Sequence, residues 1–324
     1  MPGSAARAGA RERAAALALL GLALALGALT PAFFHPANLR DLMLSNAAVQ
    51  VVALGMTLVI LTGQIDVSVG AQFAIGAVMA AVLARAGVPV PLAAAAAVGI
   101  GALLGALNGW LVAGLRLPSI VATLATLAIL RDGLRWITEG AWIGDLPPGF
   151  QWFGLGQAWG QTFLIAATGG LVLLVAWGLR HAAAGRALYA TGSNPEAARL
   201  SGLAPDRVVF GAFVAAGALT GLAAAINAVR FAQVPSTVPL GLVLKVIAAV
   251  VVGGAVITGG RGSVLGTLLG VALLGTIGTG LTFLGVSAYW ERALQGAIIL
   301  AAILSDAFVE KRAASRRPFG RGAG

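Results

Sequence analysis

The sequence lacks cysteine and has few histidines, lysines and charged residues of any kind. With no cysteine among 324 residues, disulfides, thiolate catalysis and cysteine-bound metal are excluded. The only two histidines, His35 and His181, are far apart in the sequence and predict no metal site. Charged residues make up 10% of the chain, against about 25% in an average soluble domain. The composition therefore predicts neither a metal site nor a water-soluble domain.

The motifs of ATP-hydrolysing and other common enzymes are also missing. The only lysines are Lys245 and Lys311, and neither stands in a Gly-x-x-x-x-Gly-Lys-Ser/Thr phosphate loop. There is no Gly-x-Ser-x-Gly nucleophile motif and no pair of carboxylates spaced for acid–base catalysis. The sequence predicts no catalytic residue, no cofactor and no ATPase site of its own.

What the chain has instead is long apolar segments. Hydrophobic residues make up 59% of it, and a membrane-crossing helix needs about 17–25 predominantly apolar residues. We predict an all-α, polytopic membrane bundle of about ten transmembrane helices, of which the third and eighth are short. The predicted spans are 14–30, 45–61, 70–84, 92–113, 118–138, 161–179, 208–229, 243–258, 264–284 and 290–308.

The charges that do occur indicate an orientation. The formal net charge is +10, and arginines are concentrated at the two ends and in the loop 180–207. Since positive charge next to apolar spans favours the cytoplasmic side, we read it as a topology signal and predict no nucleic-acid partner. The predicted organisation is a basic cytoplasmic N-terminus at 1–13, a transmembrane domain at 14–308 and a basic cytoplasmic tail at 309–324. An even number of spans returns both termini to the same side.

The segment Gly185–Gly202 is polar and lies between two apolar runs. Asn194 and Pro195 favour a helix start, because Asn is a good N-cap and Pro suits the first helical position. Glu196 falls in the first turn, where a negative charge suits the helix dipole, and Gly202 can end the helix. A short helix on a loop of a membrane-buried protein predicts a docking surface for a soluble partner.

A few polar residues fall in or beside the predicted spans. Asp66 is the acid closest to membrane depth, where an ionisable group is a functional candidate by default. It can equally cap the following helix by accepting the backbone N–H of Ser68 or Val69. The uncharged residues fit either a path for a hydroxylated solute or helix–helix hydrogen bonds. The translocation-path candidates are Asn46, Gln50, Gln64, Asp66, Asn108, Thr123 and Asn227.

Glycines recur at four-residue spacing, which lets helix backbones approach closely in lipid. One stripe is Gly101, Gly105 and Gly109, and a second is Gly262, Gly266 and Gly270. Two segments also look alike: residues 62–70 follow the second span and residues 258–264 follow the eighth. This similarity is compatible with an internal repeat.

Four motifs carry a family resemblance. They are GMTLVILTGQIDVSVG at 55–70, ALNGWLVAGLRLPSIVATLATL at 106–127, GRALYATGSNPEAARLSGL at 185–203 and IAAVVVGGAVITGGRGSVLGTLLG at 247–270. In this order they resemble the permease subunits of bacterial ATP-binding-cassette importers, in the ribose-type branch that takes up monosaccharides. Gln64 replaces a glycine common in that branch and, with Ala71-Gln72-Phe73, looks more like the rhamnose or autoinducer-2 members.

The resemblance implies a transport subunit of the bacterial inner membrane. Such permeases pair with a second copy or a sister permease, bind cytosolic ATP-binding subunits and receive solute from a periplasmic binding protein. Alternating access driven by those subunits would move the solute. The family's coupling loop matches residues Gly185, Arg186, Asn194, Glu196, Ala197, Ala198, Arg199 and Gly202. The alternative is an ion-coupled secondary transporter that uses Asp66 as its coupling carboxylate.

Overall fold

The protein is helical throughout the part of the chain that the structure describes. A computed structural model describes residues 3–239, 241–287, 290, 292–297 and 300. Within these residues there is no β-strand, only an isolated antiparallel bridge between Ile143 and Val234. The all-α architecture predicted from the sequence is therefore confirmed.

The helices follow the apolar runs of the sequence. They are α1 (Gly3–Leu29), α2 (Pro36–Leu61), α3 (Val69–Arg85), α4 (Val90–Gly109), α5 (Ser119–Thr138), α6 (Gln157–His181), α7 (Ala183–Ser193), α8 (Pro195–Leu200), α9 (Pro205–Ala228), α10 (Leu242–Val252) and α11 (Val264–Phe283). Short helical turns η1 (Pro31–Phe34), η2 (Trp110–Gly114) and η3 (Gln151–Gly154) join some of them. Helix α1 starts at Gly3, so most of the basic segment predicted at 1–13 continues the first helix.

Six described helices are long and apolar enough to cross a membrane. They include α1 from Glu12, α2, α4 with η2, α6, α9 and α11. Helices α3 and α10 are apolar but shorter, as the sequence predicts for the third and eighth spans. The fifth predicted span matches α5, and the tenth, 290–308, falls mainly outside the described residues. The chain is thus a multi-pass membrane protein, in which nine of the ten predicted spans correspond to a helix.

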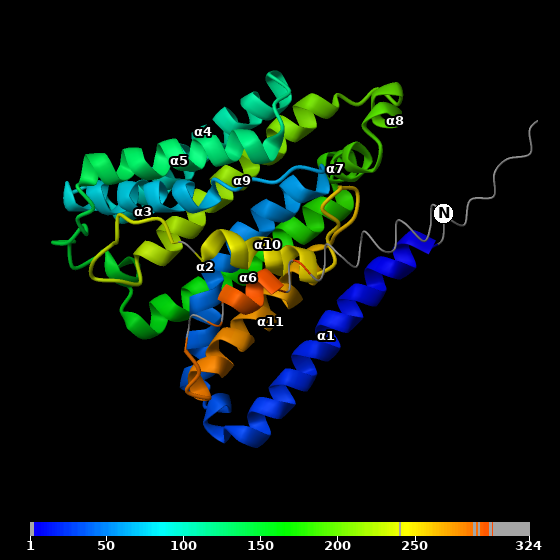
Figure 1. Cartoon of the computed structure of the whole chain (residues 1–324). Helices are drawn as coiled ribbons and strands as arrows, with labels where there is room; N and C mark the ends of the chain where they lie inside the picture. The colour runs from blue at the N-terminus through cyan, green and yellow to red at the C-terminus, as the bar shows by residue number, and fades with distance from the viewer. Residues whose placement is uncertain (1–2, 240, 288–289, 291, 298–299, 301–324) are drawn as a thin grey trace, which may run out of the picture.

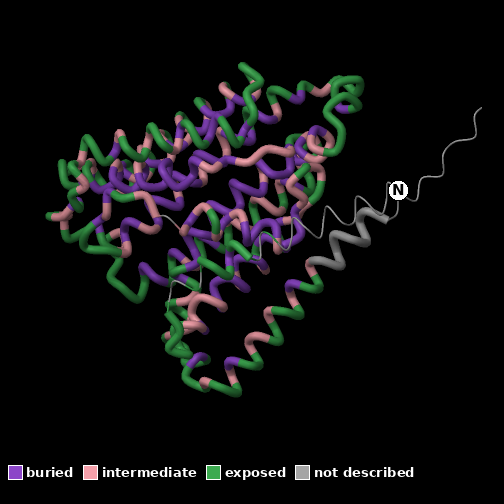
Figure 2. Tube along the Cα trace, viewed as in Figure 1, coloured by how far each residue is buried: buried purple, intermediate pink, exposed green. Residues whose placement is uncertain are grey.

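The helices form two neighbouring groups that share a buried centre (Figure 1). Helices α3, α4 and α5 lie on one side, and α2, α6, α10 and α11 lie on the other, with α9 crossing between them. Helix α1 packs along α11 and is largely exposed, whereas buried residues are concentrated along α2, α3 and α9 (Figure 2). The core is therefore organised around α2 and α9.

Glycine stripes lie at two close helix contacts. A Cβ added at Gly101 or Gly105 of α4 would overlap backbone oxygens of Gly217 or Phe213 on α9. On the other side, Cβ atoms at Gly266 and Gly270 of α11 would overlap backbone oxygens of α10 and of the residue that follows it. Because only glycine permits backbones to approach so closely, the predicted packing role is confirmed for the first stripe and for Gly266 and Gly270 of the second. Gly262 lies in the loop before α11, outside the helix contact.

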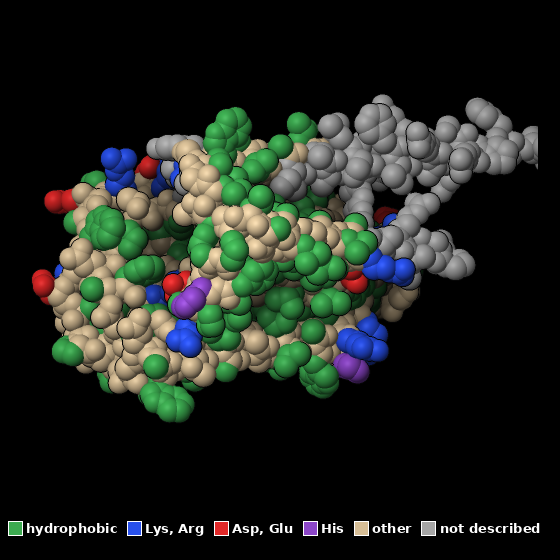
Figure 3. Space-filling model, turned by 90° about the horizontal axis from the view of Figure 1, so that it is seen from below, with side chains coloured by type: hydrophobic (Ala, Val, Ile, Leu, Met, Phe, Trp, Pro, Cys, Tyr) green, Lys and Arg blue, Asp and Glu red, His purple; other side chains and the backbone are tan. Residues whose placement is uncertain are grey.

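Apolar side chains cover the middle of the molecular surface. Figure 3 shows one face on which hydrophobic side chains occupy the centre and charged ones gather towards the two ends. Large side chains such as Trp136, Ile129 and Leu173 are at least 70% exposed. In water this surface would be an aggregation hazard, but against lipid it is the expected exterior.

Two segments interrupt the pattern of full-length helices. Residues 62–68 run from the end of α2 into the bundle before α3 begins, and residues 229–239 follow α9 before the short α10 (Figure 1). Non-helical backbone at membrane depth is tolerated only when protein surrounds it or when it lines a cavity. Protein surrounds Asp66 and Ser68 in the first segment, and the second segment lines a cavity. These two places form the candidate site.

Candidate solute cavity and coupling segment

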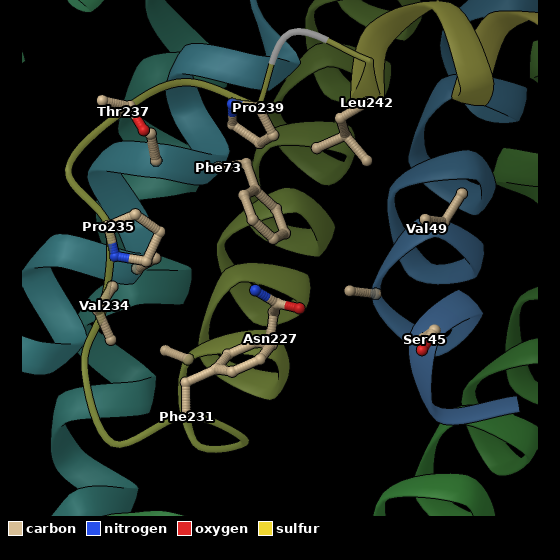
Figure 4. A pocket seen from close by; sticks show the side chains of 14 residues that line it. Ser45, Val49, Phe73, Asn227, Phe231, Val234, Pro235, Thr237, Pro239 and Leu242 are labelled. Carbon is tan, nitrogen blue, oxygen red and sulfur yellow. The ribbon is translucent and has the colours of Figure 1, made fainter. Parts of the chain in front are cut away.

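A cavity of about 260 Å³ lies between the first half of α3, the middle of α2, the end of α9 and the start of α10. Figure 4 shows Phe73, Asn227, Phe231 and Ser45 around it, with the chain 234–239 closing one side. The lining residues are Ser45, Ala48, Val49, Phe73, Ala74, Ala77, Asn227, Ala228, Phe231, Val234, Pro235, Thr237, Pro239 and Leu242. No acidic or basic side chain is among them.

The local sequence explains why the cavity forms at this place. Pro235 and Pro239 keep their segment out of a helix, since proline lacks the N–H that helix hydrogen bonding needs. The start of α3 abuts the start of α10, where a Cβ on Gly70 would lie 2.9 Å from Val243 Cγ2. The two short helices therefore meet beside the cavity. Paired short segments of this kind mark binding sites in other transporters.

The lining combines aromatic faces with neutral hydrogen-bonding groups. Phe73 and Phe231 offer apolar ring surface, and Asn227, Ser45 and Thr237 offer an amide and two hydroxyls. An amide donates and accepts, and a hydroxyl does the same. Such a set matches a small uncharged solute with several hydroxyl groups, because its C–H faces contact the rings while its hydroxyls bond the polar groups.

Of the predicted translocation-path residues, Asn227 alone lines this cavity. Asn46 and Gln50 are buried on α2, where the Asn46 amide donates to Leu42 O at 2.8 Å and packs against Gly275. The Gln50 amide has no hydrogen-bond partner within the described residues, so it retains bonding capacity for water or solute. Gln64 lies half-buried in the segment between α2 and α3.

Sequence reasoning missed the aromatic part of the lining. Phe73 stands out only as part of a family resemblance, Phe231 looks like an ordinary apolar residue, and Ser45 and Thr237 stand outside any motif. The signal that was available is the shortness of the third and eighth spans, because short discontinuous helices indicate a binding site near their ends.

The remaining predicted residues surround Asp66, which is fully buried. Its Oδ1 accepts the Ser68 backbone N–H at 2.9 Å and the Ser68 hydroxyl at 2.7 Å, and its Oδ2 accepts the Gln72 amide at 2.9 Å. The Asn108 amide lies 3.5 Å from both oxygens and donates to Ser68 Oγ at 2.7 Å. Thr123 Oγ1 accepts the backbone N–H of Val67 at 3.1 Å. Among the described residues, neutral donors alone hold the carboxylate.

The hypothesis that Asp66 caps α3 needs a correction. The N-cap of α3 is Ser68, and no side-chain hydrogen bond caps it. The predicted hydrogen bond from the Ser68 N–H to Asp66 is confirmed, but it fixes the turn before the helix rather than the first turn of the helix. With Gln72 and Asn108, Asp66 also joins the start of α3 to α4.

The predicted docking helix is present as α8, following α7. Asn194 is its N-cap and accepts the Ala197 N–H at 3.0 Å, with Pro195 at the first position. Gly202 has a φ of 83°, and hydrogen bonds run from Leu203 N to Ala198 O and from Gly202 N to Arg199 O. This is the glycine-terminated helix end expected from the sequence. The predicted start and end of α8 are confirmed.

The exposed surface of α8 is smaller than predicted. Glu196, Ala197 and Arg199 are exposed, and Arg199 pairs with Asp206 at 3.7 Å. Ala198 is buried and unavailable to a partner, whereas Leu200 is 91% exposed. An apolar side chain so exposed on a polar helix marks the docking surface better than Ala198 does.

Gly185 and Arg186 have structural roles at the corner between α6 and α7. A Cβ on Gly185 would overlap the backbone of Leu179, so this position needs glycine for close approach. Arg186 Nη1 donates to His181 O at 2.9 Å and satisfies a carbonyl at the end of α6. Both residues therefore fix the angle between the two helices.

Helix α7 is anchored to the end of α2 and to the loop that contains Gly260 and Gly262. A Cβ on Gly192 would overlap Leu61 O and lie 2.5 Å from Gly260 N, and Gly260 N donates to Leu61 O at 2.9 Å. Tyr189 donates its hydroxyl proton to Gly262 O at 2.9 Å. Burial and the nearby Glu12 carboxylate raise the pKa of Tyr189 above its usual value. It therefore remains a neutral donor at physiological pH.

Comparisons with known proteins agree on one family. Residues 38–303 match the family model described as "Branched-chain amino acid transport system / permease component". A ribose import permease protein of Escherichia coli is 37% identical to this chain; the match covers 91% of this chain and 93% of that protein. Autoinducer 2 import system permease proteins of an Enterobacter species and of Salmonella typhi are 38% and 37% identical, over 91% of this chain and 86% and 85% of theirs. No solved structure matches significantly.

Proposed function

The chain belongs to the family of branched-chain amino acid transport system permease components, and from this premise we propose that it carries a monosaccharide-like solute across the bacterial inner membrane. Its curated relatives import ribose or autoinducer 2, both small hydroxylated molecules. The chain acts as the transport subunit of an ATP-binding-cassette importer and has no ATPase site of its own.

The observation that carries this proposal is the cavity beside α3 and α10. Its two phenylalanines, its neutral polar groups and the absence of lining charge favour a hydroxylated neutral solute over an amino acid. An amino acid would carry an ammonium and a carboxylate, and these need charged or strongly polar partners when buried. The proposed solutes are therefore ribose, rhamnose or autoinducer 2 types.

The movement driven by ATP hydrolysis would start at α8, at the end of the bundle opposite the cavity. Helix α9 leads from the end of α8 to Asn227, about 33 Å away at 1.5 Å per residue. We assign α8, with Glu196, Ala197, Arg199 and Leu200, as the docking surface for a cytosolic ATP-binding subunit. A periplasmic binding protein delivers solute at the other end, and a second permease completes the path.

The proposed orientation places both termini and the α7–α8 segment in the cytoplasm, with about ten spans in all. We expect cysteines introduced as Ser201→Cys and Gln157→Cys to react with a membrane-impermeant maleimide from opposite sides. Both positions are exposed, and the natural chain has no cysteine to interfere. Labelling from the same side would contradict this topology.

Solute uptake is expected to depend on Asn227. In proteoliposomes with the ATP-binding subunit and binding protein, ATP on the α8 side should drive uptake of radiolabelled ribose, rhamnose or autoinducer 2. Asn227→Leu preserves size but leaves a solute hydroxyl unpaired at a cost of about 1–3 kcal/mol, so uptake should fall about tenfold or more. Gln161→Leu, which removes a buried amide outside the cavity, should leave it unchanged.

Two results would overturn the proposal. Uptake driven by an ion gradient without ATP would indicate a secondary transporter. Normal uptake by Asn227→Leu would remove the cavity from the solute path.

A further inference from the structure

A second, larger hollow lies between α6, α7 and α9, away from the solute cavity. Its volume is about 640 Å³, and its lining is almost wholly apolar. Leu58, Leu174, Leu188 and Ala215 are among the side chains that form it, and among the described residues Arg207 is the only charged one in the lining. None of the predicted translocation-path residues contributes.

The hollow is open where glycines leave room. Gly178 of α6 and Gly211 of α9 both line it, and a Cβ added to either would meet no atom within 4 Å. The adjoining surface of α6 is apolar and exposed, with Leu173, Leu174 and Trp177 all more than 60% accessible. An exposed apolar surface of this kind is suited to contact lipid, which would make the hollow continuous with the hydrocarbon phase.

Positive charge is concentrated at one end of the hollow. Arg207 is exposed and forms no ion pair or hydrogen bond with another described residue. Arg180 and Arg186 stand on the same α6–α7 corner, next to lining residues. The nearest acid in the sequence, Asp206, is engaged by Arg199 at 3.7 Å, and Glu196 lies on the separate helix α8. The net charge at this end of the hollow is therefore positive, and the Arg207 side chain can pair with an anionic group.

We propose that this hollow binds an anionic phospholipid, with an acyl chain between α6 and α9 and the phosphate at Arg207. Apolar walls open to the bilayer suit a hydrocarbon chain, and basic residues at the end of helices suit a lipid headgroup. An apolar helix of a partner chain would fill the walls but would leave Arg207 without a counter-charge. The bound lipid would fill the space between α7 and α9, next to the docking helix α8, and would stabilise their relative position.

Native mass spectrometry of the detergent-purified chain tests the headgroup contact. Titration with phosphatidylglycerol should give tighter-bound adducts than titration with phosphatidylcholine of the same acyl chains. Arg207→Gln should weaken the phosphatidylglycerol adduct about fivefold, the factor expected for one basic contact to an anionic lipid. Arg85→Gln, an exposed arginine at the end of α3, is the matched control and should change nothing. Equal loss in both variants would show non-specific attraction and overturn the proposal.

Filling the hollow tests the acyl-chain contact separately. Gly211→Phe should reduce the phosphatidylglycerol adduct at least about fivefold, whereas Gly99→Phe, also in open space on α4, should not. Persistence of the adduct in Gly211→Phe would overturn the proposal. So would efficient disulfide-linked dimerisation of Gly211→Cys in membranes, because a second copy of the chain would then occupy the hollow.

Discussion

Replacing Asp66 by alanine is expected to destabilise the protein and to abolish transport. The substitution removes the acceptor of two Ser68 donors and of the Gln72 amide, all of them buried. A buried donor left unpaired costs about 1–3 kcal/mol. The Gln72 and Asn108 amides can keep Ser68 Oγ as a partner, so we expect a total loss of about 2–4 kcal/mol. Thermal unfolding in detergent, followed by tryptophan fluorescence, measures it.

The exposed Asp132, which pairs with Arg131 at 3.3 Å, provides the control. Asp132→Ala should cost no more than about 1 kcal/mol, as exposed ion pairs do. If Asp66→Ala were no less stable than Asp132→Ala, the Asp66 cluster would not be a structural element.

Asp66→Asn separates structure from proton coupling. The new amide would face two other amide donors, but Gln72 Oε1 and Asn108 Oδ1 have no partner within the described residues. Rotation of either amide would turn an acceptor towards the NH₂ group of the introduced side chain. We therefore expect Asp66→Asn to be more stable than Asp66→Ala and to retain most of its uptake. A stable Asn variant without transport would show that the carboxylate itself is required, as in an ion-coupled transporter.

The sequence was sufficient for features that depend on nearby residues. Apolar run length located the helices, because a bilayer requires about twenty apolar residues in each. The cap of α8 was predictable from Asn194-Pro195 and its end from Gly202, since both act within one turn. Glycine stripes predicted close contacts, but not that α4 would meet α9 or that α10 would meet α11.

The features that could not be predicted join distant residues. Asp66 meets Asn108 across 42 positions, and Ser45 shares the cavity with Asn227 and Thr237. The apolar pattern of the helix does not show that Phe73 faces a cavity while other apolar residues of the helix pack in the core. Hydrophobic burial is non-directional, so it locates helices in the membrane without fixing which faces meet.

Helix α7 illustrates what such long-range contacts add to the function. It touches Leu61 at the end of α2 through Gly192, and the loop 253–263 through Tyr189 and Gly192. The first contact leads along residues 62–68 to Asp66 and α3, and the second leads to α10 and α11. Both short helices beside the cavity are therefore connected to the segment proposed to dock the ATP-binding subunit. A displacement of α7 can therefore be transmitted through packed contacts to both α3 and α10.

Gly192→Val is accordingly expected to block transport while leaving docking intact. Its side chain would overlap the Leu61 carbonyl and crowd Gly260, and overpacking of this kind costs about 1–3 kcal/mol or more against backbone. Because α7 must move away from both contacts, uptake should fall at least about tenfold. The ATP-binding subunit should still co-purify, since Gly192 lies on α7 against Leu61 and Gly260 and is not part of the exposed surface of α8.

Glu196→Arg and Gly169→Val complete this experiment. Glu196 is exposed on α8, and reversing its charge should release the ATP-binding subunit, because truncating one partner of a buried interface pair costs about 2–5 kcal/mol. Gly169→Val, at a position with no atom within 4 Å of an added Cβ, controls for a larger residue in a helix. If Gly192→Val also lost the subunit, α7 would belong to the docking surface. If it transported normally, the contacts of α7 with the end of α2 and with the loop 253–263 would not transmit the movement.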